Sequence, residues 1–237
     1  DALLDPQCDG PAAAGAGEPA APPDPGPWSA YRGGPALVTR LAAGRQGPVP
    51  RAVWTATAGQ DWPAALAVLV AAARAGGRGV LWLVPDARDV EAAASALREV
   101  LDEEVGVLTA DLGPAARFRA FLRVLRGHDR VVVGTRAAVF APVQDLGLVV
   151  VWDDGDDLYE EPHAPGWHAR EVAVMRSHAE GAALVLGSHS RSVEAAALVA
   201  DGTAREVVAD RATMRARSPR VRGLGDDADL ARDEAAR

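Results

Sequence analysis

Hydrophobic residues along the chain fall into short runs separated by longer segments of helical periodicity. The runs, rich in Val, Leu and Trp, lie at 52–57, 79–84, 105–109, 130–133, 148–152, 182–186 and 205–209. Apolar residues recur at three- and four-residue spacing over 35–43, 64–74, 89–101, 115–126, 167–179 and 190–199. Short Val-rich runs bounded by turn residues are typical of strands buried on both faces, as in parallel sheets covered by helices.

Strands that alternate with helices of this length predict an α/β fold, a doubly wound parallel sheet with helices on both faces. We assign this domain to residues 28–209, with Trp28 as its first anchor. Residues 1–27 are rich in Pro, Gly and Ala, which predicts a disordered linker. Residues 210–237 are rich in Arg and then Asp with few apolar positions, so they are interpreted as a second linker.

Functional residues of parallel sheets gather at the carboxyl ends of the strands. The run at 130–133 leads into Gly134, Thr135 and Arg136, and the run at 148–152 leads into an acidic cluster at 153–157. The first of these ends offers a backbone N–H, a hydroxyl and a guanidinium to a phosphate group. A helix cap beside a surface arginine explains the same residues about as well.

The turn after the first strand is where a nucleotide-binding sheet places its phosphate loop. Such a loop needs glycines, a Lys for the phosphates and a Ser or Thr for magnesium. This turn has Gly59 alone, with Gln60 and Asp61 in place of the Lys and the hydroxyl residue. The Asp61 carboxylate would repel a triphosphate. A plain connecting turn is therefore the preferred interpretation.

The acidic cluster contains Asp153, Asp154, Asp156 and Asp157. Its DDxxD string binds magnesium diphosphate in some all-helical synthases, but the valine strand before it argues against that fold. A divalent-ion site and a solvated strand exit are the two other interpretations, and we favour the second. Trp152, at the end of the same run, is expected in the core.

Four histidines follow the strand at 148–152 without a metal-ligand spacing such as HExxH; they are His163, His168, His178 and His189. We interpret them as structural. The sequence therefore predicts no catalytic residue and no metal ligand in this chain.

Charge and composition narrow the function further. The formal net charge is −8 over 237 residues, so a bulk basic field for nucleic acid is absent and any DNA contact must be local. All 25 basic residues are Arg, which excludes every mechanism that requires a lysine. The single Cys8 excludes an internal disulfide and a cysteine zinc cluster. Neither a membrane-length apolar run nor a signal-peptide pattern is present, which predicts a cytoplasmic location without membrane contact.

Several stretches together resemble the first helicase lobe of the primosomal protein N′ (PriA) family. They are residues 131–151, the acidic cluster, residues 167–178 and residues 183–188. The resemblance covers roughly residues 50–200 and implies a RecA-like lobe of a superfamily 2 helicase acting in replication restart. It further implies forked or single-stranded DNA and primosome proteins as partners. Residues 210–237 would then lead toward a second lobe, with zinc expected only in the family's C-terminal module.

The chain departs from the family pattern at the residues that handle ATP. Gln60 and Asp61 replace the phosphate-loop Lys and Thr, Trp152 replaces the magnesium-binding Asp, and Asp153 replaces the catalytic Glu. These departures resemble actinobacterial-type members, which look like helicase relatives without working ATPase motifs. The resemblance thus implies a degenerate nucleotide site, and it implies that Thr135 and Arg136 are the residues that bind DNA phosphates. The degenerate positions are Gly59, Gln60, Asp61, Trp152, Asp153 and Asp154.

Three functional hypotheses follow. The leading one is a replication-restart scaffold that binds DNA and primosome proteins, needs no cofactor within this chain, and hydrolyses no ATP. The second is an active ATP-dependent 3′–5′ DNA helicase lobe with divergent motifs. The third is an unrelated α/β enzyme, such as a Rossmann-type transferase with a cofactor pocket at the end of the first strand.

Overall fold

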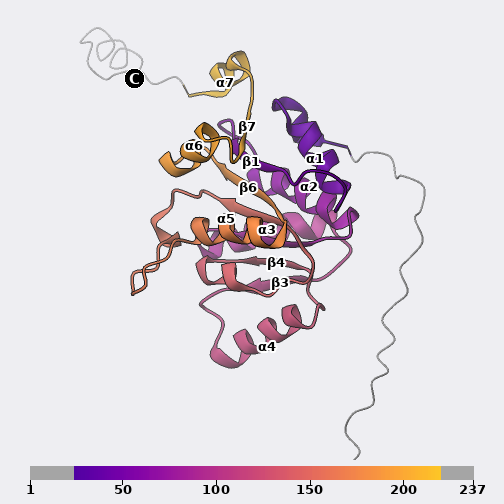
Figure 1. The fold of residues 1–237 in the computed structure, drawn as a ribbon, viewed down its shortest axis with the longest axis vertical. Coiled ribbons are helices and arrows are strands. Elements are labelled where there is room, and N and C mark those ends of the chain that lie inside the picture. The colour runs from indigo at the N-terminus through magenta and orange to yellow at the C-terminus, as the bar shows by residue number, and fades with distance from the viewer. Residues whose placement is uncertain (1–23, 220–237) are drawn as a thin grey trace, which may run out of the picture.

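The computed structural model describes residues 24–219, which build one seven-stranded sheet (Figure 1). All of its paired strands are parallel, in the order β3-β4-β2-β5-β6-β1-β7. The strands are β1 (Arg51–Thr55), β2 (Gly79–Leu83), β3 (Val105–Leu108), β4 (Val131–Gly134), β5 (Leu146–Trp152), β6 (Ala183–Ser188) and β7 (Arg205–Val208). The predicted α/β fold with a doubly wound parallel sheet is confirmed.

Helices connect most successive strands at the positions that the periodicity predicts. The helices are α1 (Gly34–Ala42), α2 (Trp62–Ala75), α3 (Ala87–Val100), α4 (Pro114–Leu125), α5 (Ala169–Glu180), α6 (Val193–Ala200) and α7 (Arg211–Arg217). Three short 3-10 turns complete the described chain: η1 (Gly26–Ala30), η2 (Arg136–Phe140) and η3 (Asp157–Tyr159). The 3-10 turn η2 joins β4 to β5, while α1 precedes the first strand and α7 follows the last. Figure 1 shows α4 beside the edge strand β3, while α6 and α7 lie at the other end of the sheet.

The strands alternate their side chains between two cores. On β2, Val80 and Trp82 belong to the core beneath α1, α2 and α3, whereas Leu81 and Leu83 belong to the core beneath α5. Every residue of β2 is buried, and so is every residue of β5. A strand buried on both faces cannot show a polar alternation, which is why the sequence reads as continuous Val and Leu runs.

Polar residues fix where the helices begin. The Asp86 carboxylate accepts a hydrogen bond from Asp89 N at 2.9 Å and starts α3. Ser192 starts α6 in the same way through Ala195 N at 3.0 Å. Each cap satisfies an N–H that would otherwise lack an intrahelical partner. The predicted anchor Trp28 is fully buried, and its indole N–H donates to Ala65 O at 2.7 Å.

The two predicted linkers lie mostly outside the described residues, namely at 1–23 and 220–237. A short helix, α7, occupies Arg211–Arg217 at the start of the predicted second linker. Asp210 Oδ1 accepts from Ala212 N and Thr213 N at 2.8 and 2.9 Å, so one carboxylate caps this short helix. No helix of residues 24–219 is long and apolar enough to cross a membrane.

Candidate functional site

The phosphate-loop position is the turn that leaves β1, at residues 57–61. Two of its backbone amides have partners within the chain. Thr57 N donates to the Tyr31 hydroxyl at 3.1 Å, and Gln60 N donates to Thr57 O at 3.1 Å. Gly59 takes a positive φ of 71°, a conformation that suits glycine and closes the turn tightly. The amides of Thr57 and Gln60 are therefore engaged within the chain.

Asp61 occupies the N-terminus of α2 with its own carboxylate. Asp61 Oδ1 accepts from Ala64 N at 3.1 Å, and Asp61 O accepts from Ala65 N at 3.1 Å. A helix N-terminus attracts anions because its first N–H groups lack intrahelical partners. Here a side chain of the protein supplies that anion, in the place where a nucleotide phosphate would bind.

Tyr31 lies over the same turn from outside the sheet. Its hydroxyl lies 3.2 Å from Thr57 Oγ1 and donates to Gln60 Oε1 at 3.1 Å. From the other end of the described chain, Arg217 of α7 donates to Thr57 Oγ1 at 3.3 Å. Segments before β1 and after β7 therefore meet on the phosphate-loop turn. These contacts could not be predicted from the sequence, because the residues are far apart along the chain.

Aromatic rings fill the space between this turn and the end of β5. Trp62 stacks on Trp152 with ring centroids 4.5 Å apart and an interplanar angle of 10°. His189 meets the Trp152 ring edge-on at 5.3 Å, and Trp54 lies 5.7 Å from it. Trp152 is 4% exposed, so its predicted place in the core is confirmed. These rings form an apolar layer at the carboxyl end of the central strands.

The aromatic layer continues away from β5 toward the start of the described chain. Trp28 lies 4.7 Å from Trp54, and Tyr31 lies edge-on to Trp54 at 5.6 Å. Paired aromatic rings contribute about 0.5–1.5 kcal/mol beyond the area they bury. The phosphate-loop turn thus lies beside a packed aromatic layer and is hydrogen-bonded by the Tyr31 hydroxyl.

The acidic cluster begins with a strained residue. Asp153 has a φ of 53°, which is unusual for a residue other than glycine, and its N–H donates to Gly187 O at 2.6 Å. Burial raises the pKa of the Asp153 carboxyl, and the neighbouring Asp156 and Asp154 carboxylates raise it further. Among residues 24–219, no group of three or more His, Cys, Asp or Glu side chains is arranged to hold a metal ion.

Asp154 and Arg170 form a buried ion pair beneath the cluster. Arg170 NH1 donates to Asp154 O at 2.9 Å and lies 3.5 Å from Asp154 Oδ2. The Ser192 hydroxyl donates to the same carboxylate oxygen at 2.5 Å. The side chains of Asp154 and Arg170 are 1% and 6% exposed. Their contacts join the end of β5 to α5 and to the start of α6.

Curated relatives identify the family of this chain. A probable replication restart protein PriA of Mycobacterium tuberculosis (strain CDC 1551 / Oshkosh) is 48% identical over 219 residues, covering 92% of this chain and 33% of that protein. The corresponding protein of Mycobacterium leprae is 47% identical over 206 residues, covering 86% of this chain and 31% of its own length. The chain belongs to the PriA family. It spans about a third of the length of these relatives.

Other comparisons agree with the PriA assignment or describe the fold alone. The replication restart protein PriA of Chlamydia trachomatis is 36% identical over 123 residues, covering 52% of this chain and 16% of that protein. No family model matches the chain. The C-terminal domain of S. cerevisiae Dbp5 has a TM-score of 0.50 and 16% identity, and covers 79% of this chain and 97% of that domain. This likeness shows a RecA-like helicase fold.

In this PriA chain, Thr135 and Arg136 follow β4 at the carboxyl end of the strands. Thr135 N donates to Leu108 O at 3.2 Å, and Thr135 precedes η2 without a side-chain capping bond in that turn. Arg136 NH1 donates to Leu158 O and Glu160 O at 3.2 and 2.6 Å. Arg136 NH2 also lies 3.1 Å from Glu161 Oε2. The guanidinium predicted to bind DNA therefore holds the turn after η3.

The histidines of the PriA chain have structural contacts. His168 Nδ1 accepts from Arg170 N at 3.1 Å and starts α5. Burial lowers the pKa of His168, and the nearby Arg170 charge lowers it further. His178 Nδ1 lies 2.9 Å from Val174 O one turn earlier, and His163 pairs with Glu161 on the surface at 2.9 Å.

Proposed function

We propose that this chain is a helicase-derived lobe that supports replication restart by binding DNA and partner proteins, and that it does not hydrolyse ATP. The restart role is proposed from the mycobacterial and chlamydial relatives, which are replication restart proteins PriA. The absence of hydrolysis is proposed from the geometry of the nucleotide position. Because the chain spans about a third of the length of those relatives, both statements concern this lobe alone.

One observation carries the proposal: residues of the chain occupy two of the N–H positions at the phosphate-loop turn and the start of α2. Asp61 takes the N-terminus of α2, and the Tyr31 hydroxyl takes the N–H of Thr57. A triphosphate entering here would approach a carboxylate instead of a lysine ammonium, and like charges repel. It would also meet the stacked Trp62 and Trp152 rings where the PriA pattern places a magnesium-binding Asp.

Isothermal titration of the chain with ATP and magnesium tests this proposal. We expect no heat of binding at millimolar ATP and no release of phosphate from the chain. The informative comparison is the double variant Gln60→Lys/Asp61→Thr, which restores both phosphate-loop residues of the family pattern. We expect it to remain unable to hydrolyse ATP, because Tyr31 and the tryptophan pair are unchanged. Micromolar ATP binding by the unmodified chain that is lost on changing Gln60 or Asp61 would support the active-helicase alternative.

The same proposal includes a DNA contact at the end of β4, in which Thr135 and Arg136 have different roles. The Thr135 hydroxyl lies at the end of β4 and makes no capping bond within η2, so it is the stronger candidate for a phosphate. Arg136 contributes chiefly by holding residues 158–161 in place, since two carbonyl oxygens and Glu161 already surround its guanidinium. Fluorescence anisotropy with forked DNA tests this: Arg136→Ala and Thr135→Val should both weaken binding. Unchanged affinity of both variants at low salt would remove this strand end from the interface.

A further inference from the structure

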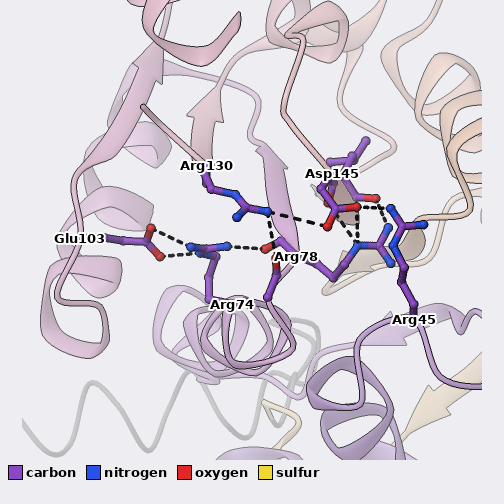
Figure 2. Close-up of polar contacts among 8 residues, drawn as sticks. Arg45, Arg74, Arg78, Glu103, Arg130 and Asp145 are labelled. Carbon is purple, nitrogen blue, oxygen red and sulfur yellow. Dashed lines mark hydrogen bonds and ion pairs between the residues drawn. The ribbon is translucent and has the colours of Figure 1, made fainter. Parts of the chain in front are cut away.

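Arginines converge at the amino edge of the sheet, opposite the nucleotide position (Figure 2). They come from the loop after α1, the end of α2 and the residues that precede β2 and β4. We call them, with the two carboxylates they contact, the amino-edge cluster. Its members are Arg45, Arg74, Arg78, Glu103, Arg130 and Asp145.

Three guanidinium groups of this cluster share a single carboxylate. Arg45 NH2 forms an ion pair with Asp145 Oδ1, and Arg78 Nε lies 3.2 Å from the same oxygen. Arg130 NH2 lies 3.8 Å from Asp145 Oδ2. Asp145 has a φ of 50°, the left-handed conformation. One carboxylate cannot balance three cations that all lie within 4 Å of it.

Two of the arginines are committed to the fold. Arg78 is 8% exposed and donates from Nε to Asp145 O at 3.2 Å and from NH2 to Leu146 O, which joins the starts of β2 and β5. Arg74 pairs with both carboxylate oxygens of Glu103 and donates to Arg78 O at 2.8 Å. Their directions are therefore fixed by backbone oxygens as well as by charge.

The other two arginines retain donors that can reach a ligand. Arg45 is 72% exposed and contacts Asp145 through NH2, and within residues 24–219 its Nε and NH1 make no hydrogen bond. Arg130 is 33% exposed and donates from NH2 to Gly77 O at 2.9 Å, while its NH1 makes no hydrogen bond to another residue of 24–219.

The amino-edge cluster carries an excess of positive charge, with four guanidiniums and two carboxylates. The chain as a whole has a net charge of −8. The cluster is therefore a locally basic site on an acidic chain, and such a local field directs a polyanion toward it.

We propose that the amino-edge cluster binds phosphate groups of a nucleic-acid backbone through Arg45 and Arg130. The planar guanidinium fork fits two phosphate oxygens, and arginine is the usual residue for such bidentate contacts. Arg74, Arg78 and Asp145 hold the two binding arginines in position. The inference rests on the proposed DNA-binding function and places a contact on the edge opposite Thr135.

The test measures binding of a fluorescein-labelled single-stranded oligothymidine to the complete chain by anisotropy. Arg45→Gln/Arg130→Gln should weaken binding about tenfold and reduce the slope of log K against log salt by roughly 0.7 for each lost phosphate contact. The matched control is Arg88→Gln/Arg211→Gln, which removes the same charge from exposed positions at the start of α3 and α7. We expect the control to leave affinity within about twofold of the unmodified chain.

Asp145→Asn separates a binding role from a purely structural one. Asparagine has nearly the same shape and tolerates a positive φ, so the loop conformation should survive. If the cluster binds phosphate, removing the competing carboxylate should tighten oligothymidine binding several-fold. If the arginines serve only to join the loops, the variant should lower the unfolding temperature without any gain in affinity, and that result would overturn the inference.

Competition with inorganic phosphate distinguishes a site for the nucleic-acid backbone from a site for free phosphate. A site for the nucleic-acid backbone should release oligothymidine in high salt but not in millimolar phosphate at constant ionic strength. Displacement by millimolar phosphate that depends on Arg45 and Arg130 would overturn the backbone assignment in favour of a free-anion site. Binding of oligothymidine that is equal in all variants would overturn the inference alone. Failure of the unmodified chain to bind either ligand would overturn the inference, and failure to bind forked DNA as well would also overturn the proposed DNA-binding function.

Discussion

The Tyr31→Phe substitution tests whether the hydroxyl above the phosphate-loop turn is a structural partner of that turn. The change removes one oxygen and leaves the ring on Trp54. It leaves the buried Thr57 N–H without its acceptor and removes the contacts to Thr57 Oγ1 and Gln60 Oε1. A typical hydrogen bond contributes about 1 kcal/mol, and a buried donor left without a partner costs about 1–3 kcal/mol. We expect the free energy of unfolding to fall by about 2 kcal/mol.

Tyr159→Phe is the matched control, because Tyr159 is also fully buried and donates one hydrogen bond, to Trp152 O at 2.7 Å. A carbonyl oxygen that loses one partner is less costly than an N–H without any. We expect a loss of about 1 kcal/mol for this control.

Urea unfolding followed by circular dichroism measures both variants. With a slope of about 2 kcal/mol per molar urea, the midpoint should fall by about 1 M for Tyr31→Phe and by about half as much for Tyr159→Phe. A Tyr31 loss equal to or smaller than the Tyr159 loss would refute the hydrogen-bond account of the turn. Faster hydrogen exchange of the Thr57 amide in the Tyr31 variant alone would support it.

Three further predictions concern the carboxyl edge. Because the pKa of Asp153 is raised in the folded chain, ionising it costs stability as pH rises above its ordinary value of 3.8; Asp153→Asn should therefore raise the unfolding temperature at pH 7 but not at pH 3, and an equal gain at both pH values would contradict this. The pKa of His168 is lowered, so the stability that neutral His168 contributes to the folded chain is present above its ordinary pKa of 6.5 and is lost as pH falls through the folded-state pKa. His168→Asn keeps the helix cap and should therefore make stability depend less on pH across this acidic range, as thermal melts in a pH series would show. Arg170→Met should destabilise by about 3–5 kcal/mol by leaving Asp154 buried without its cation, and Asp154→Asn in the same chain should recover much of that loss; an additive double variant in urea unfolding would refute the coupling.

Local sequence signals predicted most of the elements correctly. The valine runs of β4 and β5 were visible because each signal lies within a few residues of the element it defines. The same reasoning missed α7, since a short helix with few apolar positions depends on the Asp210 cap. Residues close in sequence therefore revealed most elements.

The candidate site was predicted in part. The PriA resemblance indicated that Gln60, Asp61 and Trp152 depart from the pattern, but it could not indicate what fills the nucleotide position. Tyr31 reaches the turn from a different segment, and the Trp62–Trp152 stack joins α2 to β5. Such contacts arise only when distant segments pack together. The partners of Arg136 were missed for the same reason, since they lie on the turn after η3.

The position of β1 in the sheet has a consequence for how the polypeptide acquires its structure on the ribosome. β1 pairs with β6 on one side and β7 on the other, so neither of its neighbours is a strand close to it in the sequence. The apolar side chains of Val53 and Trp54 thus remain without their sheet partners until residues 183–208 have been synthesised. Long-range pairing of this kind slows folding and prolongs the exposure of apolar surface on the nascent chain. A ribosome-stalled product ending before β6 should accordingly recruit chaperones, whereas one extended past β7 should become resistant to protease.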